Sequence, residues 1–277
     1  MYFLGKILGI FFGFMFGNVL GAIFGAFLGH QFDKARRLAR GGFRTSGFGQ
    51  GPNQVERQQA FFRAGFSVMG HVAKAKGQVT QNEIHLATTI MHRMNLTPEQ
   101  RRAAQNAFRE GKEPGFPLKE TLEGVRISAA GRFDLLQFFL ELQISAAFAD
   151  GNLHPSERDV LHIIAQGLGF SAAQLEQRLQ AQEAAFRFQQ GGGQQGGGSW
   201  QQASSANQLA DAYKVLGIEE DAESKTIKRA YRKLMNEHHP DKLMAKGLPP
   251  EMINVAKEKA QEIQSAYDII KKAKDFK

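Results

Sequence analysis

An uninterrupted apolar stretch lies close to the N-terminus of this chain. Residues 7–28 contain no ionisable side chain. As an α-helix this stretch would rise about 33 Å, enough to cross a hydrocarbon core of about 30 Å. Helices of soluble domains usually keep one polar face, and a cleaved signal peptide would have a shorter apolar core followed by a small-x-small site. The sequence continues instead as GHQFDKARR, so it predicts an uncleaved transmembrane anchor over residues 1–30.

The basic residues lie unevenly around this stretch. Lys6 and the amino terminus precede it, whereas five cations follow it: Lys34, Arg36, Arg37, Arg40 and Arg44. Because positively charged flanks tend to stay in the cytoplasm, we expect a single pass with the N-terminus outside and residues 30–277 inside. Residues 40–53 are rich in Gly, Ser and Arg without an apolar period, and we assign residues 31–54 to a basic juxtamembrane linker.

Glycine recurs at every fourth position of the apolar stretch, from Gly5 to Gly29. Small residues at this spacing let helix backbones approach closely in lipid, and a repeat longer than 3.6 residues favours a right-handed crossing. One hypothesis is therefore a homodimer formed in the lipid bilayer, with a hydrogen bond from the one amide side chain of the span. The residues expected at that contact are Gly9, Gly13, Gly17, Asn18, Gly21 and Gly25. The alternative, a plain anchor whose Phe rings cover the glycine gaps, stays open.

The middle of the chain contains an internal repeat. Residues 77–100 align with residues 151–174, and each copy has a Gly turn followed by a Ser/Thr-x-x-Gln helix start. Apolar residues keep helical spacing in both copies, so we predict an all-α domain of two helical pairs over residues 55–187. The sequence ADGNLHPSE at 149–157 resembles the TerB-like domains of tellurite-resistance proteins.

Some TerB-like domains carry acidic metal sites near this turn. Asp150 and Glu157 are present in the second copy, but Lys76 stands in place of the acidic residue in the first. Because a hard metal ion needs several oxygen ligands at once, we expect turn and capping roles here and no resident metal. The following residues, 188–206, are rich in Gln and Gly and predict a flexible tether that lets the last domain sample a wide volume.

The last segment, residues 207–277, contains three helical patterns. DAYKVLG at 211–217 predicts a short helix closed by glycine, and residues 224–238 and 251–272 predict two longer helices joined by a loop. The 224–238 helix is amphipathic, with one stripe of apolar residues and, nearly opposite, one of cations. These stripes are Ile227, Ala230, Tyr231 and Leu234, and Lys225, Lys228, Arg229 and Arg232. Pro240 ends the helix and biases His239 toward extended geometry.

The motifs DAYKVLG, IKRAYRKL, HPD and QSAYDII, in this order, resemble the J domain of the DnaJ family over about residues 207–275. Together with the apolar span and the TerB-like domain, they resemble membrane-anchored co-chaperones of the DjlA type. The resemblance implies a protein of the bacterial inner membrane, with a periplasmic N-terminus, that docks on a DnaK-type chaperone and stimulates its ATP hydrolysis. It also implies an activating motif, His239, Pro240 and Asp241, and a docking face, Lys228, Arg229, Tyr231, Arg232 and Lys233.

Some features depart from this family pattern. Glu237 and His238 occupy a helix end that is often more basic, and Glu223 replaces the usual Ser or Thr at the helix start. The chain has no cysteine, which excludes disulfides, thiolate zinc sites and Cys nucleophiles. His154-Pro155 has the first two residues of the HPD motif but is followed by Ser156, so we assign it to a helix start.

Other functional classes fit the sequence less well than a co-chaperone. An enzyme would need a nucleophile or ligand cluster beyond His238, His239 and Asp241, and none is evident, so neither catalysis nor a cofactor is expected. Nucleic-acid binding is disfavoured because the segment 206–277 has 14 basic and 12 acidic residues and no stacking platform. The remaining alternative is a membrane scaffold or sensor that acts mainly through a ligand or metal bound by the TerB-like domain.

Overall fold

The computed structural model describes residues 53–77, 88–148, 151–191 and 200–276. The predicted transmembrane anchor with its glycine row, and the basic linker up to residue 52, lie outside these described residues. Within them the regular elements are helices, which confirms the predicted all-α class. None of the described helices is long and apolar enough to cross a bilayer.

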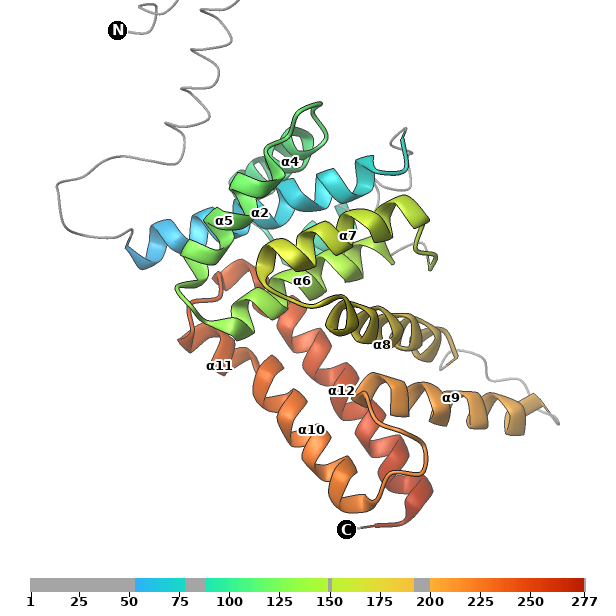
Figure 1. Cartoon of the computed structure of the whole chain (residues 1–277). Helices are drawn as coiled ribbons and strands as arrows, with labels where there is room; N and C mark the ends of the chain where they lie inside the picture. The colour runs from blue at the N-terminus through green and yellow to red at the C-terminus, as the bar shows by residue number, and fades with distance from the viewer. Residues whose placement is uncertain (1–52, 78–87, 149–150, 192–199, 277) are drawn as a thin grey trace, which may run out of the picture. The chain divides into compact units, whose positions relative to one another are not determined.

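The helices follow one another from Gln54 to Lys274 (Figure 1). In the middle of the chain they are α2 (Gln54–Lys74), residues 88–93, α4 (Pro98–Gly111), α5 (Leu118–Ala129), α6 (Phe133–Ala147), α7 (Pro155–Leu168) and α8 (Ala172–Gly191). In the C-terminal segment they are α9 (Trp200–Leu216), α10 (Ser224–His238), α11 (Pro240–Ala245), the 3₁₀ helix η1 (Pro250–Met252) and α12 (Ile253–Lys274).

The predicted helix starts of the internal repeat are present in both copies. Thr97 accepts a hydrogen bond from the backbone N–H of Gln100, whose side chain accepts one from the N–H of Thr97. Ser171 and Gln174 make the same reciprocal pair at the start of α8. Each pair satisfies two backbone donors that the first turn of a helix leaves open. The turns also correspond, because Gly77 and Gly151 both adopt positive φ angles, 101° and 87°.

The core of the middle domain forms around α2 and α6. Helix α6 is apolar on almost every face, and eleven of its residues are buried. Helix α2 crosses α4 with the backbones in direct contact at Gly70 and Gly111. A Cβ atom on Gly70 would lie 2.0 Å from the carbonyl oxygen of Phe108, and one on Gly111 would lie 1.7 Å from that of Ser67. Only glycine permits this crossing.

The C-terminal helices build a hairpin around a second core, to which Ala184 and Ala185 of α8 also contribute. Helices α10 and α12 run side by side, and α9 packs against α12 (Figure 1). The buried core includes Ile227 from α10 and Ile263 and Ile270 from α12, together with Tyr213 and Leu216 from α9. The apolar stripe of the sequence therefore does face its partner helix, as predicted for 224–238.

Two connections differ in part from the sequence expectations. Part of the loop expected after the HPD motif is helix α11, which Pro240 begins and whose Leu243 is buried. The tether expected over residues 188–206 is helical where it is described, since α8 continues to Gly191 and α9 begins at Trp200, while residues 192–199 lie outside the described residues. The last domain is also not independent, because residues 54–277 form one unit in which side chains that follow the HPD motif join the middle core. Local composition does not reveal such long-range packing.

Candidate docking site at the HPD turn

The cations of α10 form an exposed face on the side away from the hairpin core. Helix α10 matches the predicted bounds, and its hydrophobic stripe turns toward α12, so the opposite residues Arg229, Arg232 and Lys233 are exposed. Lys228 is half-buried, with its Nζ atom 5.2 Å from the ring centroid of Phe276. Three of the four predicted docking cations are thus presented directly to solvent.

Tyr231, the fifth residue of the predicted docking face, has a structural contact on the inner side of the hairpin. Its ring stacks on Tyr267 with centroids 4.1 Å apart, and its hydroxyl donates to the Oε1 atom of Gln264. Burial raises the pKa of the Tyr231 hydroxyl, and the charge of Asp268 adds to the rise. The side chain braces α10 against α12, and its role in docking stays a prediction.

The HPD motif is a sharp turn between two helices. His239 has φ −63° and ψ 124°, the extended geometry expected before a proline, and it ends α10 and precedes α11. Its Nδ1 atom accepts a hydrogen bond of 3.2 Å from the backbone N–H of Asp241. Asp241 is exposed, and His239 and Pro240 are half-buried. The turn therefore lies at the surface, beside the exposed end of the cationic face.

The start of α10 is weakly capped, as its sequence suggested. Glu223 occupies the cap position with extended φ and ψ, but its side chain makes no capping hydrogen bond. The control dipeptide His154-Pro155 does begin a helix. His154 caps α7, and its backbone N–H donates to the Oε2 atom of Glu157 at 3.1 Å.

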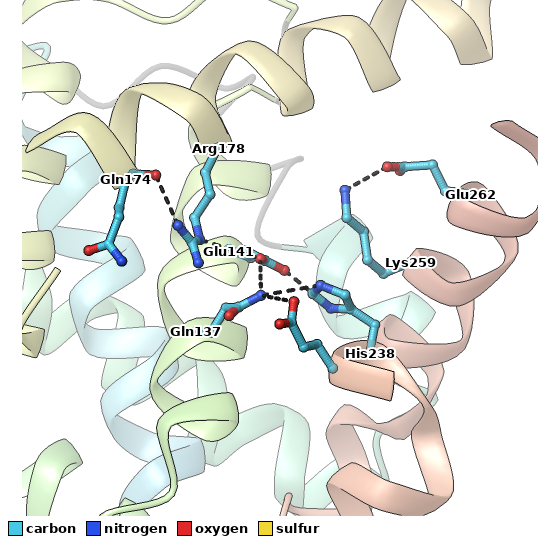
Figure 2. Close-up of polar contacts among 8 residues, drawn as sticks. Gln137, Glu141, Gln174, Arg178, His238, Lys259 and Glu262 are labelled. Carbon is cyan, nitrogen blue, oxygen red and sulfur yellow. Dashed lines mark hydrogen bonds and ion pairs between the residues drawn. The ribbon is translucent and has the colours of Figure 1, made fainter. Parts of the chain in front are cut away.

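His238 is the functional-site neighbour that sequence reasoning missed. The sequence places it in a polar helix end, yet only 2 % of it is exposed. Its Nδ1 atom lies 3.4 Å from the Oε2 atom of Glu141, and its Nε2 atom lies 3.4 Å from the Nε2 atom of Gln137 (Figure 2). A signal was present, because position 238 continues the apolar stripe of Ile227, Tyr231 and Leu234 at helical spacing.

Polar side chains from both domains form a network around this histidine. Glu141 accepts a hydrogen bond of 3.2 Å from Gln137 and lies 3.6 Å from the Nε atom of Arg178 (Figure 2). Gln137 also donates to Glu237 at 3.3 Å. On α12, burial would lower the pKa of Lys259, but the carboxylates of Glu262 and Glu141 outweigh it and raise that pKa overall. The unusual Glu237-His238 pair thus contacts the middle domain.

Lys76, which stands where the first repeat was expected to have an acidic residue, forms an ion pair with the second repeat. The Nζ atom of Lys76 lies 3.3 Å from the Oε1 atom of Glu157, whose side chain is only 3 % exposed. An ammonium group therefore stands beside the buried carboxylate of the second repeat. Asp150, the other acidic residue of that turn, lies outside the described residues.

Comparisons with known proteins agree with this architecture. Family models match in order: the transmembrane domain of the co-chaperone DjlA at residues 1–43, the tellurite resistance protein TerB at residues 63–180, and the DnaJ domain at residues 211–275. Co-chaperone protein DjlA of Vibrio parahaemolyticus is 73 % identical, that of Vibrio cholerae 69 % and that of Salmonella typhimurium 51 %, each over 100 % of both chains. No solved structure matches the chain.

A helical hairpin with a surface HPD turn, matched by the DnaJ domain model, defines the broad class: a J-domain protein. More narrowly, the chain belongs to the DjlA family of co-chaperones, as the full-length identities show. The match of residues 1–43 to the transmembrane domain of this family indicates a membrane-anchored protein.

Proposed function

We propose that this protein docks a DnaK-type chaperone at the cytoplasmic face of the inner membrane and stimulates its ATP hydrolysis through His239, Pro240 and Asp241. The observation that carries the proposal is the position of the HPD turn. It lies at the surface, at the end of the helix whose outer face exposes Arg229 and Arg232. In this role the protein regulates the ATPase activity of another protein, the DnaK-type chaperone.

The electrostatics of the hairpin suit docking. A row of exposed cations attracts an acidic surface from a distance and raises the association rate in a salt-dependent way. At the end of the row, the Asp241 carboxylate is exposed and accepts hydrogen bonds, while the His239 ring is held by its bond to the Asp241 backbone. Groups fixed in this way favour one conformer of a partner, and a tenfold stimulation requires only about 1.4 kcal/mol of differential binding.

The direct test is the ATPase rate of a DnaK-type chaperone mixed with the full chain in lipid nanodiscs. We expect His239→Gln to abolish the stimulation that the wild type gives. His154→Gln is a matched control, because it changes the other His-Pro dipeptide, which caps α7. Equal stimulation by wild type and His239→Gln would refute the proposal and favour the scaffold or sensor alternative.

The docking face is tested by charge reversal. Arg232→Glu and Lys233→Glu remove exposed cations of α10, and we expect each to raise the concentration needed for half-maximal stimulation, most strongly at low salt. Lys257→Glu is the matched control, because Lys257 is an exposed cation on α12. An equal effect of all three variants would show that net charge alone matters and that α10 is not the docking face.

The anchoring part of the proposal concerns residues 1–53. We propose a single pass with a periplasmic N-terminus, supported by the five cations that follow the apolar stretch. Pairing of two chains through the glycine row would raise the local concentration of J domains without a new contact. A reporter enzyme fused before Lys6, active only in the periplasm, tests the orientation, and activity only in the opposite fusion would reverse it.

A further inference from the structure

The segment that follows the HPD turn is embedded in the middle domain. Four of its apolar side chains, each at most 1 % exposed, belong to the hydrophobic core built by α2 and α6 and not to the core of the hairpin. They are Leu243, Leu248, Met252 and Ala256. Met252 packs directly on α2, because its Cε atom lies 3.0 Å from the place where a Cβ atom on Gly65 would be.

Polar contacts surround this apolar insertion. Gln58 on α2 donates a hydrogen bond of 3.2 Å to the backbone oxygen of Leu248. Gln100 on α4 donates one of 2.7 Å to the Oε1 atom of Glu251. Because Gln100 also closes the capping box of α4, the same side chain serves the fold of the middle domain and its contact with η1.

Two ion pairs and a backbone contact extend the interface. Lys246, just after α11, pairs with Asp134 at the start of α6. On α12, Glu258 lies 3.6 Å from Arg93, and Asn254 donates to the backbone oxygen of Arg93 at 3.2 Å. The polar contacts come from α2, α4, α6 and the helix at residues 88–93, so four separate helices of the middle domain hold this segment.

The HPD turn therefore has a buried residue on each side that fixes its position. His238, immediately before the turn, is buried against Gln137 and Glu141 of α6 (Figure 2). Leu243, two residues after the turn, is fully buried. Between these two points the chain makes only the His239–Asp241 turn, so little freedom is left to it.

We infer that the middle domain is a permanent platform that holds the HPD turn in its acting geometry, a positioning role not supplied by the hairpin alone. The contact is not autoinhibitory, for two reasons. Asp241, Arg229 and Arg232 are exposed while the platform is in place. Opening it would bring the four buried apolar side chains into water, which is strongly unfavourable. The inference rests on the proposed function for its activity readout.

The consequence for activity is a change in apparent affinity. A turn that is already ordered loses little conformational entropy when it binds a partner, whereas a released turn must be ordered at that moment. Loss of the contact with the middle domain should raise the concentration of this protein needed for half-maximal chaperone stimulation about tenfold. The maximal ATPase rate should stay unchanged, because His239, Pro240 and Asp241 remain present.

The platform contact itself can be tested without any chaperone. The chain has no cysteine, so Met252→Cys and Met244→Cys each introduce a single thiol. Met252 is fully buried in the platform contact, whereas Met244 on α11 is 40 % exposed. In the full chain in nanodiscs, we expect maleimide to label Met252→Cys about a hundredfold more slowly than Met244→Cys. Equal labelling rates would overturn the inference even if the wild type stimulates the chaperone.

The positioning role is tested with Met252→Ser against the matched control Met244→Ser. Met252 is not part of the hairpin core, so Met252→Ser should weaken the contact between the middle domain and the segment after the HPD turn while the hairpin core stays intact. We expect Met252→Ser to raise the concentration for half-maximal stimulation about tenfold and Met244→Ser to leave it at the wild-type value. A lower half-maximal concentration, or a higher maximal rate, would show autoinhibition and refute the inference, and an unchanged value would refute positioning.

A second variant guards against general misfolding. Asp134→Lys places two cations together at the Lys246 pair, and we expect it to raise the half-maximal concentration. Adding Lys246→Asp restores an ion pair with reversed charges and should recover wild-type behaviour. Failure of the double variant to recover would contradict the platform. If no variant and not even the wild type stimulates the chaperone while Met252→Cys stays protected, the proposed function fails and the platform contact stands.

Discussion

Replacing Gly70 by alanine tests whether the crossing of α2 and α4 depends on glycine. The added Cβ atom would lie 2.0 Å from the carbonyl oxygen of Phe108 and 2.9 Å from its carbonyl carbon, whereas ordinary contacts begin near 3.4 Å. Both obstructing atoms are backbone, so no side chain can rotate away, and the helices must separate by more than about 1 Å. Overpacking of this kind costs about 1–3 kcal/mol.

A gain in helix propensity opposes this cost. Alanine is favoured over glycine inside a helix by about 1 kcal/mol, so the net loss for Gly70→Ala should be up to about 2 kcal/mol. Gly124 on α5 is the matched control, because it is exposed and nothing lies within 4 Å of its added Cβ atom. Gly124→Ala should therefore stabilise the protein by up to about 1 kcal/mol.

The assay is urea unfolding of a fragment covering residues 54–277, which contains both hydrophobic cores. We expect the midpoint to fall for Gly70→Ala and to rise for Gly124→Ala. Gly111→Ala approaches the same crossing from α4, 1.7 Å from the carbonyl oxygen of Ser67, and should behave like Gly70→Ala. If Gly70→Ala is as stable as Gly124→Ala, the close approach of these helices is refuted.

Three further predictions concern single groups. Burial lowers the pKa of His71 in the folded protein, so this side chain binds a proton more readily in the unfolded protein. The free energy of unfolding should therefore fall as the pH drops below about 6.5. His71→Gln should weaken this pH dependence in urea titrations at several pH values. Lys76→Met leaves the buried carboxylate of Glu157 without its ammonium partner and should cost about 1–3 kcal/mol in thermal unfolding, and an unchanged midpoint would contradict the pairing. Gly17→Ile and Gly21→Ile should reduce self-association in a membrane reporter assay, and no response would leave a plain anchor.

The interplay of the two domains changes how the hairpin should be studied. A fragment that begins near residue 200 would expose Leu248 and Met252, which are buried by the middle domain here. Exposed apolar surface of this kind promotes association and alters the segment next to the HPD turn. Assays on the full chain are therefore the appropriate measure of its activity.

The local structure of this protein follows from residues that are close together in the chain. Periodicity set the bounds of α10, reciprocal Thr/Ser–Gln pairs marked the starts of α4 and α8, and Pro240 fixed the HPD turn. These features depend on residues within about four positions of one another, so they can be predicted from the sequence. The same local order carried the family resemblance that the full-length comparisons confirm.

The way in which the two helical domains combine became known only from the packed arrangement of their helices. The spacing of His238 placed it on the apolar stripe of α10 but could not name Glu141 as its neighbour, and Gly70 was one glycine among 30 until its contact with Phe108 was known. The sequence suggested that the segment after the HPD turn is a loop on a tethered domain, whereas its apolar side chains belong to the core of the middle domain. Each of these contacts joins residues far apart in the chain, and the burial and shape that select such partners exist only once the helices have packed.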